Sequence, residues 1–150
     1  MKRIPRSIII LGILAIICAG AVGYYIYNKP HEDILHADSD FELTTKALYA
    51  AFKDDAQSAA ITYIDKILLV TGNVGKVESV HDTVFIVLLE VEGAPLGNVK
   101  CAIDPAFNTG VASLQPGDKV SIKGRCSGSS KTEEMGLVLL DVEMTRCVIP

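Results

Sequence analysis

The chain has 150 residues, of which 49% are hydrophobic, and a formal net charge of −4 at neutral pH. Leaving out the basic residues Lys2, Arg3 and Arg6 gives 11 basic residues (14 minus 3) against 18 acidic ones, a net charge near −7 for the rest. Nucleic acids and anionic lipids are bound by clustered Lys and Arg, so this composition argues against both as partners.

An apolar run without a charged side chain occupies residues 7–27. At ~1.5 Å per helical residue the run reaches roughly 30 Å, the thickness of a bilayer's hydrocarbon core. Basic residues precede it and acidic residues follow it, which predicts a cytoplasmic amino terminus, residues 1–6, and an extracytoplasmic remainder. We therefore predict a single-pass transmembrane helix over 7–27 that fixes the protein to the cell membrane, with its carboxyl-terminal domain in the periplasm if the cell is Gram-negative.

A cleaved signal peptide is the alternative interpretation of this run, because the small residues of 19–21 fit a cleavage site after Ala21. Apolar residues continue through Ile26, which favours the uncleaved anchor. A lipid-modified cysteine needs a small residue before it, and Ile17 precedes Cys18. Anchor and signal peptide both export residues 28–150, so only the attachment differs between them.

Residues 28–43 are polar and have no clear period, which predicts a linker. Residues 44–65 are predicted to form a helical segment of two short helices. Thr44 or Thr45 caps the first helix, and a second capping signal near Asp54 marks the break between them. We expect both helices to pack against the domain that follows.

From residue 66 to residue 150 the pattern changes to branched strand residues separated by Gly and Pro turns. Gly72 and Gly75 within the first strand indicate a bulge or a bend. Five strands are expected, at 68–77, 83–91, 98–103, 119–126 and 137–148, with a polar loop over 128–136. A longer connection between the third and fourth strands predicts a mainly β fold, a five-stranded Greek-key barrel of the OB type.

Short motifs along nearly the whole chain resemble one known family. They are NKPH at 28–31, VTGNV at 70–74, VKC at 99–101, GDKVSIKGRCSG at 117–128 and TRC at 145–147, together with the helical residues Leu48, Phe52, Ala59 and Tyr63. The chain resembles the membrane-anchored tRNA-anti-like OB-fold proteins of bacteria, whose activity is undefined. The resemblance implies the fold and the location. The family name reflects similarity to anticodon-binding folds and does not imply RNA binding.

Cys101, Cys126 and Cys147 fall in the exported part, where disulfides form, whereas Cys18 falls in the anchor. There is no Cys-x-x-Cys motif and no His within four residues of these three, so we expect structural cysteines and no metal. A polar loop over 128–136 would leave Cys126 more than about 30 Å from Cys147. The third and fifth strands of an OB barrel are parallel neighbours, so Cys101–Cys147 is the preferred disulfide and Cys101–Cys126 the alternative.

One modest basic cluster is a weak candidate binding surface. It consists of Lys119, Lys123, Arg125 and Lys131. Bases need aromatic platforms to stack on, and beyond Tyr63 only Phe85 and Phe107 are aromatic. The more economical interpretation is an ordinary charged strand face.

The sequence contains no catalytic triad, phosphate loop or dinucleotide motif, so we expect no enzymatic activity and no cofactor. The predicted function is a membrane-anchored, non-enzymatic binding or interaction module whose partner is a protein or an envelope component. The alternative function is the binding of single-stranded nucleic acid or oligosaccharide on the barrel face.

Overall fold

The structure is a computed structural model that describes residues 6–27, 34–81, 84–134 and 136–150. The chain divides into two units, Met1–Glu32 and Asp33–Pro150. In the first unit, helix α1 (Arg6–Tyr27) has 22 residues. A search of the described residues for membrane spans finds no helix that is long and apolar enough to qualify. Residues 1–5 and 28–33, which belong to the predicted cytoplasmic terminus and linker, lie outside the described residues.

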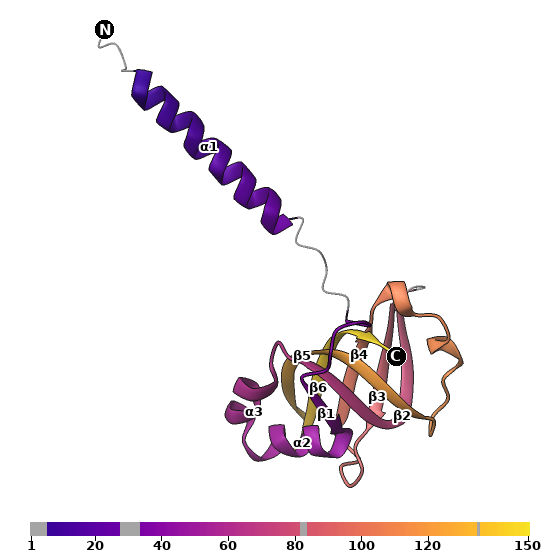
Figure 1. The fold of residues 1–150 in the computed structure, drawn as a ribbon. Helices are drawn as coiled ribbons and strands as arrows, with labels where there is room; N and C mark the ends of the chain where they lie inside the picture. Colours follow the sequence, from indigo (N-terminus) through magenta and orange to yellow (C-terminus); the bar gives the residue numbers. More distant parts are fainter. Residues whose placement is uncertain (1–5, 28–33, 82–83, 135) are drawn as a thin grey trace. The chain divides into compact units, whose positions relative to one another are not determined.

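The second unit is a barrel made from one sheet (Figure 1). Its strands are β1 (Phe41–Thr44), β2 (Ile67–His81), β3 (Val84–Glu90), β4 (Asn98–Ile103), β5 (Lys119–Glu134) and β6 (Leu137–Val148). They follow the order β1-β2-β3-β4-β6-β5, and β2 also pairs with β5. Strands β2, β3, β4, β6 and β5 therefore close a ring with the strand order of a Greek-key OB barrel, and β4 and β6 are parallel neighbours, as expected.

The prediction of five strands is wrong, because the described residues form a sheet of six. The additional strand, β1, lies within the predicted linker and the residue after it, and it pairs in parallel with the start of β2. Its side chains alternate, with Phe41 and Leu43 packed against the core and Glu42 and Thr44 exposed. Four residues are too few to show a period of two in a polar stretch, so the sequence pattern did not reveal this strand.

The predicted polar loop over 128–136 is also wrong, because β5 extends to Glu134 and pairs with β6 along this stretch. Ser129 pairs with Val142 and Glu134 with Leu137, so the two strands form a long hairpin. Here β5 pairs with β6 alone, and its polar side chains do not reach the core. Without an apolar face, a strand has no alternating pattern to read.

Two helices precede the barrel, as the sequence predicts: α2 (Thr45–Asp54) and α3 (Ala56–Tyr63). The Thr44 hydroxyl accepts a hydrogen bond from the Ala47 amide, and the Asp55 carboxylate caps α3. The Ser58 hydroxyl and the amides of Ser58 and Gln57 donate to this carboxylate, and these three hydrogen bonds lower the pKa of Asp55. Helix α2 places Leu48 and Phe52 in the barrel core, where both are buried. The connection between β4 and β5 has only the short 3₁₀ turns Pro105–Phe107 and Val111–Ser113, so α2 supplies the larger helical surface of the core.

Strand β2, whose first residues also pair with β1, changes its antiparallel partner near its middle. Its first half, from Ile67 to Asn73, pairs with β5, and its second half pairs with β3. The register with β3 shifts between Val74 and Lys76, which confirms a bulge at Gly75. Gly72 has another role, because a Cβ there would collide with the side chain of the buried Thr45.

Residues 34–40 form a segment, called the strap below, that lies on the barrel. The Asp40 amide donates to the Ile67 carbonyl at 2.8 Å, and the Ile67 amide donates to the Asp40 carboxylate at 2.9 Å. Ile34 is buried against Ile67 and Val148. This part of the predicted linker is therefore an integral part of the folded unit.

Candidate functional site

Strands β2, β3, β4 and β6 present a continuous surface on the outside of the barrel, and ligands of OB folds commonly bind on the corresponding strands. Residues paired across neighbouring strands point to the same side of a sheet. The outward residues make three rows: Asn73, Glu90, Asn98 and Asp141; Lys76, Leu88, Lys100 and Glu143; and Glu78, Ile86 and Ala102. We call these eleven residues the outer face.

The centre of the outer face is aliphatic. Ile86 and Ala102 are paired across β3 and β4, and Leu88 is the next outward residue along β3. All three are half-buried. Phe85, the nearest ring in sequence, packs against the core instead. The face therefore offers contact area to aliphatic groups and no aromatic platform.

Ion pairs border this aliphatic centre on both sides. Lys76 Nζ lies 2.7 Å from Glu78 Oε1, and Lys100 Nζ lies 2.7 Å from Asp141 Oδ2. The hydrogen bond to Asp141 is the main cause that raises the pKa of Lys100 above its usual value. The face holds two lysines and four carboxylates, a net charge of −2. Both lysines are thus paired with carboxylates, and negative charge remains.

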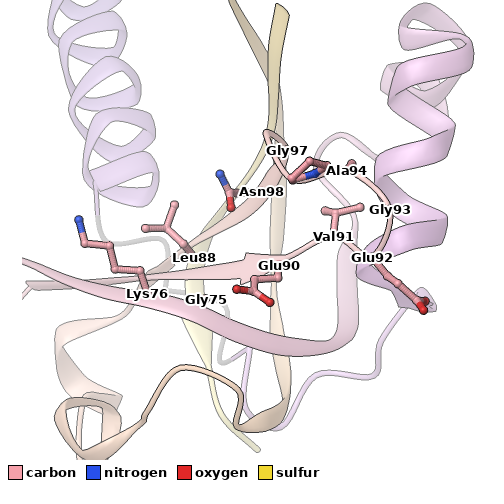
Figure 2. Close-up of a pocket in the computed structure, with 11 residues that line it drawn as sticks. Gly75, Lys76, Leu88, Glu90, Val91, Glu92, Gly93, Ala94, Gly97 and Asn98 are labelled. Atoms are coloured by element: carbon pink, nitrogen blue, oxygen red, sulfur yellow. The ribbon is translucent and has the colours of Figure 1, made fainter.

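A hollow of about 580 Å³ adjoins the outer face where β3 turns into β4 (Figure 2). Leu88, Lys76 and Glu90 of the outer face line one side, and the turn from Val91 to Asn98 lines the other. The turn is closed by backbone hydrogen bonds from Ala94 to Val91 and from Gly97 to Ala94, each of 3.0 Å. Gly93 of the turn is exposed and has no side chain, so a ligand can reach main-chain groups at this point of the wall.

Two glycines set the shape of this hollow. A Cβ on Gly75 would lie 2.7 Å from Cγ of Glu90, so the Glu90 side chain rests directly on the backbone of β2 (Figure 2). A Cβ on Gly97 would collide with the ring of Tyr49 from α2. Lys46, at the start of α2, adds an ion pair of 3.7 Å with Glu92 of the turn. These contacts join the turn to α2 and fix the rim of the hollow.

The four basic residues of the predicted binding surface all lie on β5, but they do not form a cluster. Lys119 pairs with Asn73 at one end of β5 and Lys131 with Leu140 near the other. At ~3.3 Å per residue these two lie on the order of 40 Å apart along the strand. Arg125 donates a hydrogen bond of 3.4 Å to the Asp65 carbonyl. The structure therefore does not bring these residues together as one surface.

Lys123 holds the strap. Its ammonium group donates to the carbonyls of Ala37 and Leu35, at 3.0 and 3.3 Å. These bonds satisfy two backbone acceptors that the strap does not pair within a strand. The side chain points outward from the barrel, as its alternation along β5 predicts, and the strap covers it.

The three cysteines of the second unit are buried free thiols. Cys126 pairs across the β5–β6 hairpin with Met144, so the expectation that it lies far from Cys147 is wrong. The reason is that β5 continues to Glu134, so Leu137 pairs with Glu134 and Cys126 lies further along β6. Burial raises the pKa of Cys126. The described residues contain no group of three or more His, Cys, Asp or Glu side chains arranged to hold a metal ion.

The sequence predicts the barrel face only as an alternative site and identifies none of the residues of the outer face, although one signal points to them. The run from Val84 to Leu89 is apolar throughout, whereas a half-exposed strand alternates apolar and polar residues. Its odd positions pack in or against the core, whereas Ile86 and Leu88 belong to the aliphatic centre of the outer face. An apolar strand with an uncovered outer side is thus a signature of a binding surface.

Comparison with known proteins agrees with this architecture. The family model described as tRNA_anti-like matches residues 1–143. The chain belongs to the tRNA_anti-like family. A search of curated protein sequences finds no match.

Among solved structures, a proposed nucleic acid-binding lipoprotein of Klebsiella pneumoniae is similar, with 13% identity, a TM-score of 0.54, and 81% of this chain and 98% of that chain covered. At this identity the likeness shows the fold alone. An asparaginyl-tRNA synthetase of Entamoeba histolytica has 17% identity and a TM-score of 0.39, with 57% and 20% covered. OBody NL8, in complex with hen egg-white lysozyme, has 19% identity and a TM-score of 0.36, with 56% and 92% covered. With TM-scores below 0.5, neither structure supports a conclusion about this chain.

The position of Lys123 leads to a stability prediction. Lys123→Met keeps most of the aliphatic stem but removes the ammonium donor, and it leaves the carbonyls of Leu35 and Ala37 without that donor. We expect the free energy of unfolding to fall by about 1–3 kcal/mol. Urea denaturation of the full-length protein measures it. Lys119→Met, at an exposed position of the same strand, is the control and should shift it by less than about 0.5 kcal/mol. Equal effects of both variants would contradict the role given to Lys123.

Proposed function

We propose that this protein is a membrane-anchored, non-enzymatic binding module that receives a polypeptide ligand on its outer face. The observation that carries the proposal is the aliphatic centre of Ile86, Leu88 and Ala102, bordered by ion pairs and continuous with the hollow at the β3–β4 turn. Half-buried aliphatic side chains bind aliphatic side chains of a partner, and a border of ion pairs suits a polar rim. The partner is accordingly a protein or a peptide-bearing envelope component.

The character of the same surface favours a polypeptide over a nucleic acid. Sites for single-stranded nucleic acid combine a positive groove with aromatic side chains, each stacked base being worth ~1–3 kcal/mol. The outer face and the lining of the hollow contain no aromatic residue. The two lysines of the face are engaged with Glu78 and Asp141. Phosphates would therefore have to displace carboxylates from both lysines.

The attachment to the membrane is proposed from the sequence. Residues 7–27 contain no charged side chain, and basic residues precede them. Such a run inserts as a helix with its positive flank in the cytoplasm. On this proposal the barrel lies outside the cytoplasm, and its ligand belongs to the cell envelope. The lipoprotein named among the similar structures shares the fold, but Cys18 of this chain lies inside the apolar run and follows Ile17.

Membrane fractionation with substitutions in the apolar run tests the mode of attachment. The full-length protein should stay in the membrane fraction after a carbonate wash, and Cys18→Ser should leave this unchanged. Ile17→Arg places a charge near the middle of the run, costs ~2.5–3.5 kcal/mol of insertion free energy, and should deplete the membrane fraction. Ile17→Leu is the matched control. Release by Cys18→Ser would indicate a lipid anchor, and a mature chain that begins after Ala21 would indicate a cleaved signal peptide.

The binding surface can be tested in cells with a photo-crosslinking amino acid at Ala102, on the outer face. We expect a protein adduct whose yield falls about tenfold with Leu88→Glu, since a carboxylate next to an aliphatic contact costs more than ~1.4 kcal/mol of binding free energy. The control is Ile61→Glu, at a side chain of α3 that is 80% exposed. Equal yields in both variants would contradict the assignment of the surface. An adduct that nuclease removes would favour nucleic acid as the ligand instead.

A further inference from the structure

Two cysteines from neighbouring parallel strands enter the same part of the barrel interior. In the β4–β6 register, Cys101 is opposite Met144, and Ile103 is opposite Cys147. The register shifts between these two pairs, and Arg146 adopts a left-handed conformation with φ of 51°. The shift places one additional residue on β6, so that Met144 and Cys147 both point inward, as Cys101 and Ile103 do. Both cysteine side chains are fully buried.

A glycine on β5, the other neighbour of β6, makes room for the Cys147 thiol. Gly124 of β5 faces this site, and a Cβ there would lie 2.5 Å from the Cys147 sulfur and 3.2 Å from Cε of Met144. No side chain from β5 can therefore stand at this point between Cys147 and the interior. The Cys147 thiol therefore occupies the space that a side chain at position 124 would take, in the interior that β4 also lines.

The contacts of the thiols distinguish the possible pairs. Burial raises the pKa of the Cys147 thiol well above its usual value, and the neighbouring Cys101 thiol raises it further. The pKa of Cys126 responds to burial, to the backbone of Gly128 and to Asp65, and to neither of the other thiols. Of the three cysteines, Cys101 and Cys147 are thus the two in mutual contact.

The geometry points to Cys101 and Cys147 as a disulfide-forming pair that joins β4 to the carboxyl-terminal end of β6. In the reaction the two thiols lose two protons and two electrons, and an S–S bond forms between them. The electrons pass by thiol–disulfide exchange to an oxidant that itself contains a disulfide, whose S–S bond breaks to give two thiols. In the cell this reaction depends on the export proposed above, because disulfides persist in oxidising compartments.

Burial decides when the bond can form. Exchange requires a thiolate that an oxidant can reach, and both thiols are inaccessible once the barrel has closed. The bond therefore forms while β6 is not yet packed against β4, during folding, and the native barrel then protects it. Oxidant added to folded, reduced protein should react far more slowly than oxidant present during refolding.

Refolding of the full-length protein in a glutathione redox buffer tests the pairing without depending on export. Wild type should become about 2 Da lighter, the mass of the two hydrogens lost, and leave two of its four cysteines, Cys18 and Cys126, open to alkylation after denaturation. Cys126→Ser, the matched control, should still form the bond, whereas Cys101→Ser and Cys147→Ser should not. A non-reducing digest of wild type identifies the linked peptides even if a variant fails to fold.

Two results of this experiment would overturn the proposal: complete alkylation of the cysteines of refolded wild type, or a linked peptide that contains Cys126. The same digest, applied to protein taken from membranes under alkylating conditions, tests the proposed export separately from the proposed pairing. A Cys101–Cys147 bond found after refolding but not in the protein from cells would support the pairing and overturn the proposed export.

Discussion

Closure of the barrel depends on β2, because this strand is hydrogen-bonded to both β3 and β5. A straight strand cannot pair with both neighbours, since a closed sheet must coil around its own core. The bulge at Gly75 lies at the change of partner, next to Asn73, which pairs with residues of both strands. Substitution of Gly75 would also disturb Glu90, which rests on its backbone. One local irregularity thus closes the barrel and shapes the hollow beside the outer face.

The proposed function follows from where this architecture leaves charge and apolar area. Lys123, which a sequence-based interpretation assigns to a basic surface, holds the strap instead. Lys76 and Lys100 reach the outer face, but each forms an ion pair with a carboxylate. Surface ion pairs contribute little to stability, so their consequence here is selectivity. They disfavour phosphate, and they leave the aliphatic residues between them as the main source of binding energy.

Much of the fold could be predicted from the sequence, because apolar alternation and turn residues reflect burial directly. The two helices, the bulge at Gly75 and the parallel pairing of β4 with β6 were accessible in this way. β1 and the outer half of the hairpin were not, because short or polar strands carry no apolar period. The outer face was hidden for the opposite reason. In the run from Val84 to Leu89 the core-facing and the outward residues are all apolar, and only the register of the strand shows which side chains face outward.

We propose that the outer face binds a polypeptide and lacks the chemistry to bind nucleic acid. The most direct measurement is fluorescence anisotropy of a labelled single-stranded oligonucleotide of about 20 nucleotides, longer than the ~4–16 nucleotides that one OB fold covers. It is titrated with the full-length protein at low salt, where phosphate contacts are strongest. We expect no saturable binding. Saturable binding that salt weakens, and that Lys76→Glu or Lys100→Glu abolishes, would contradict this proposal.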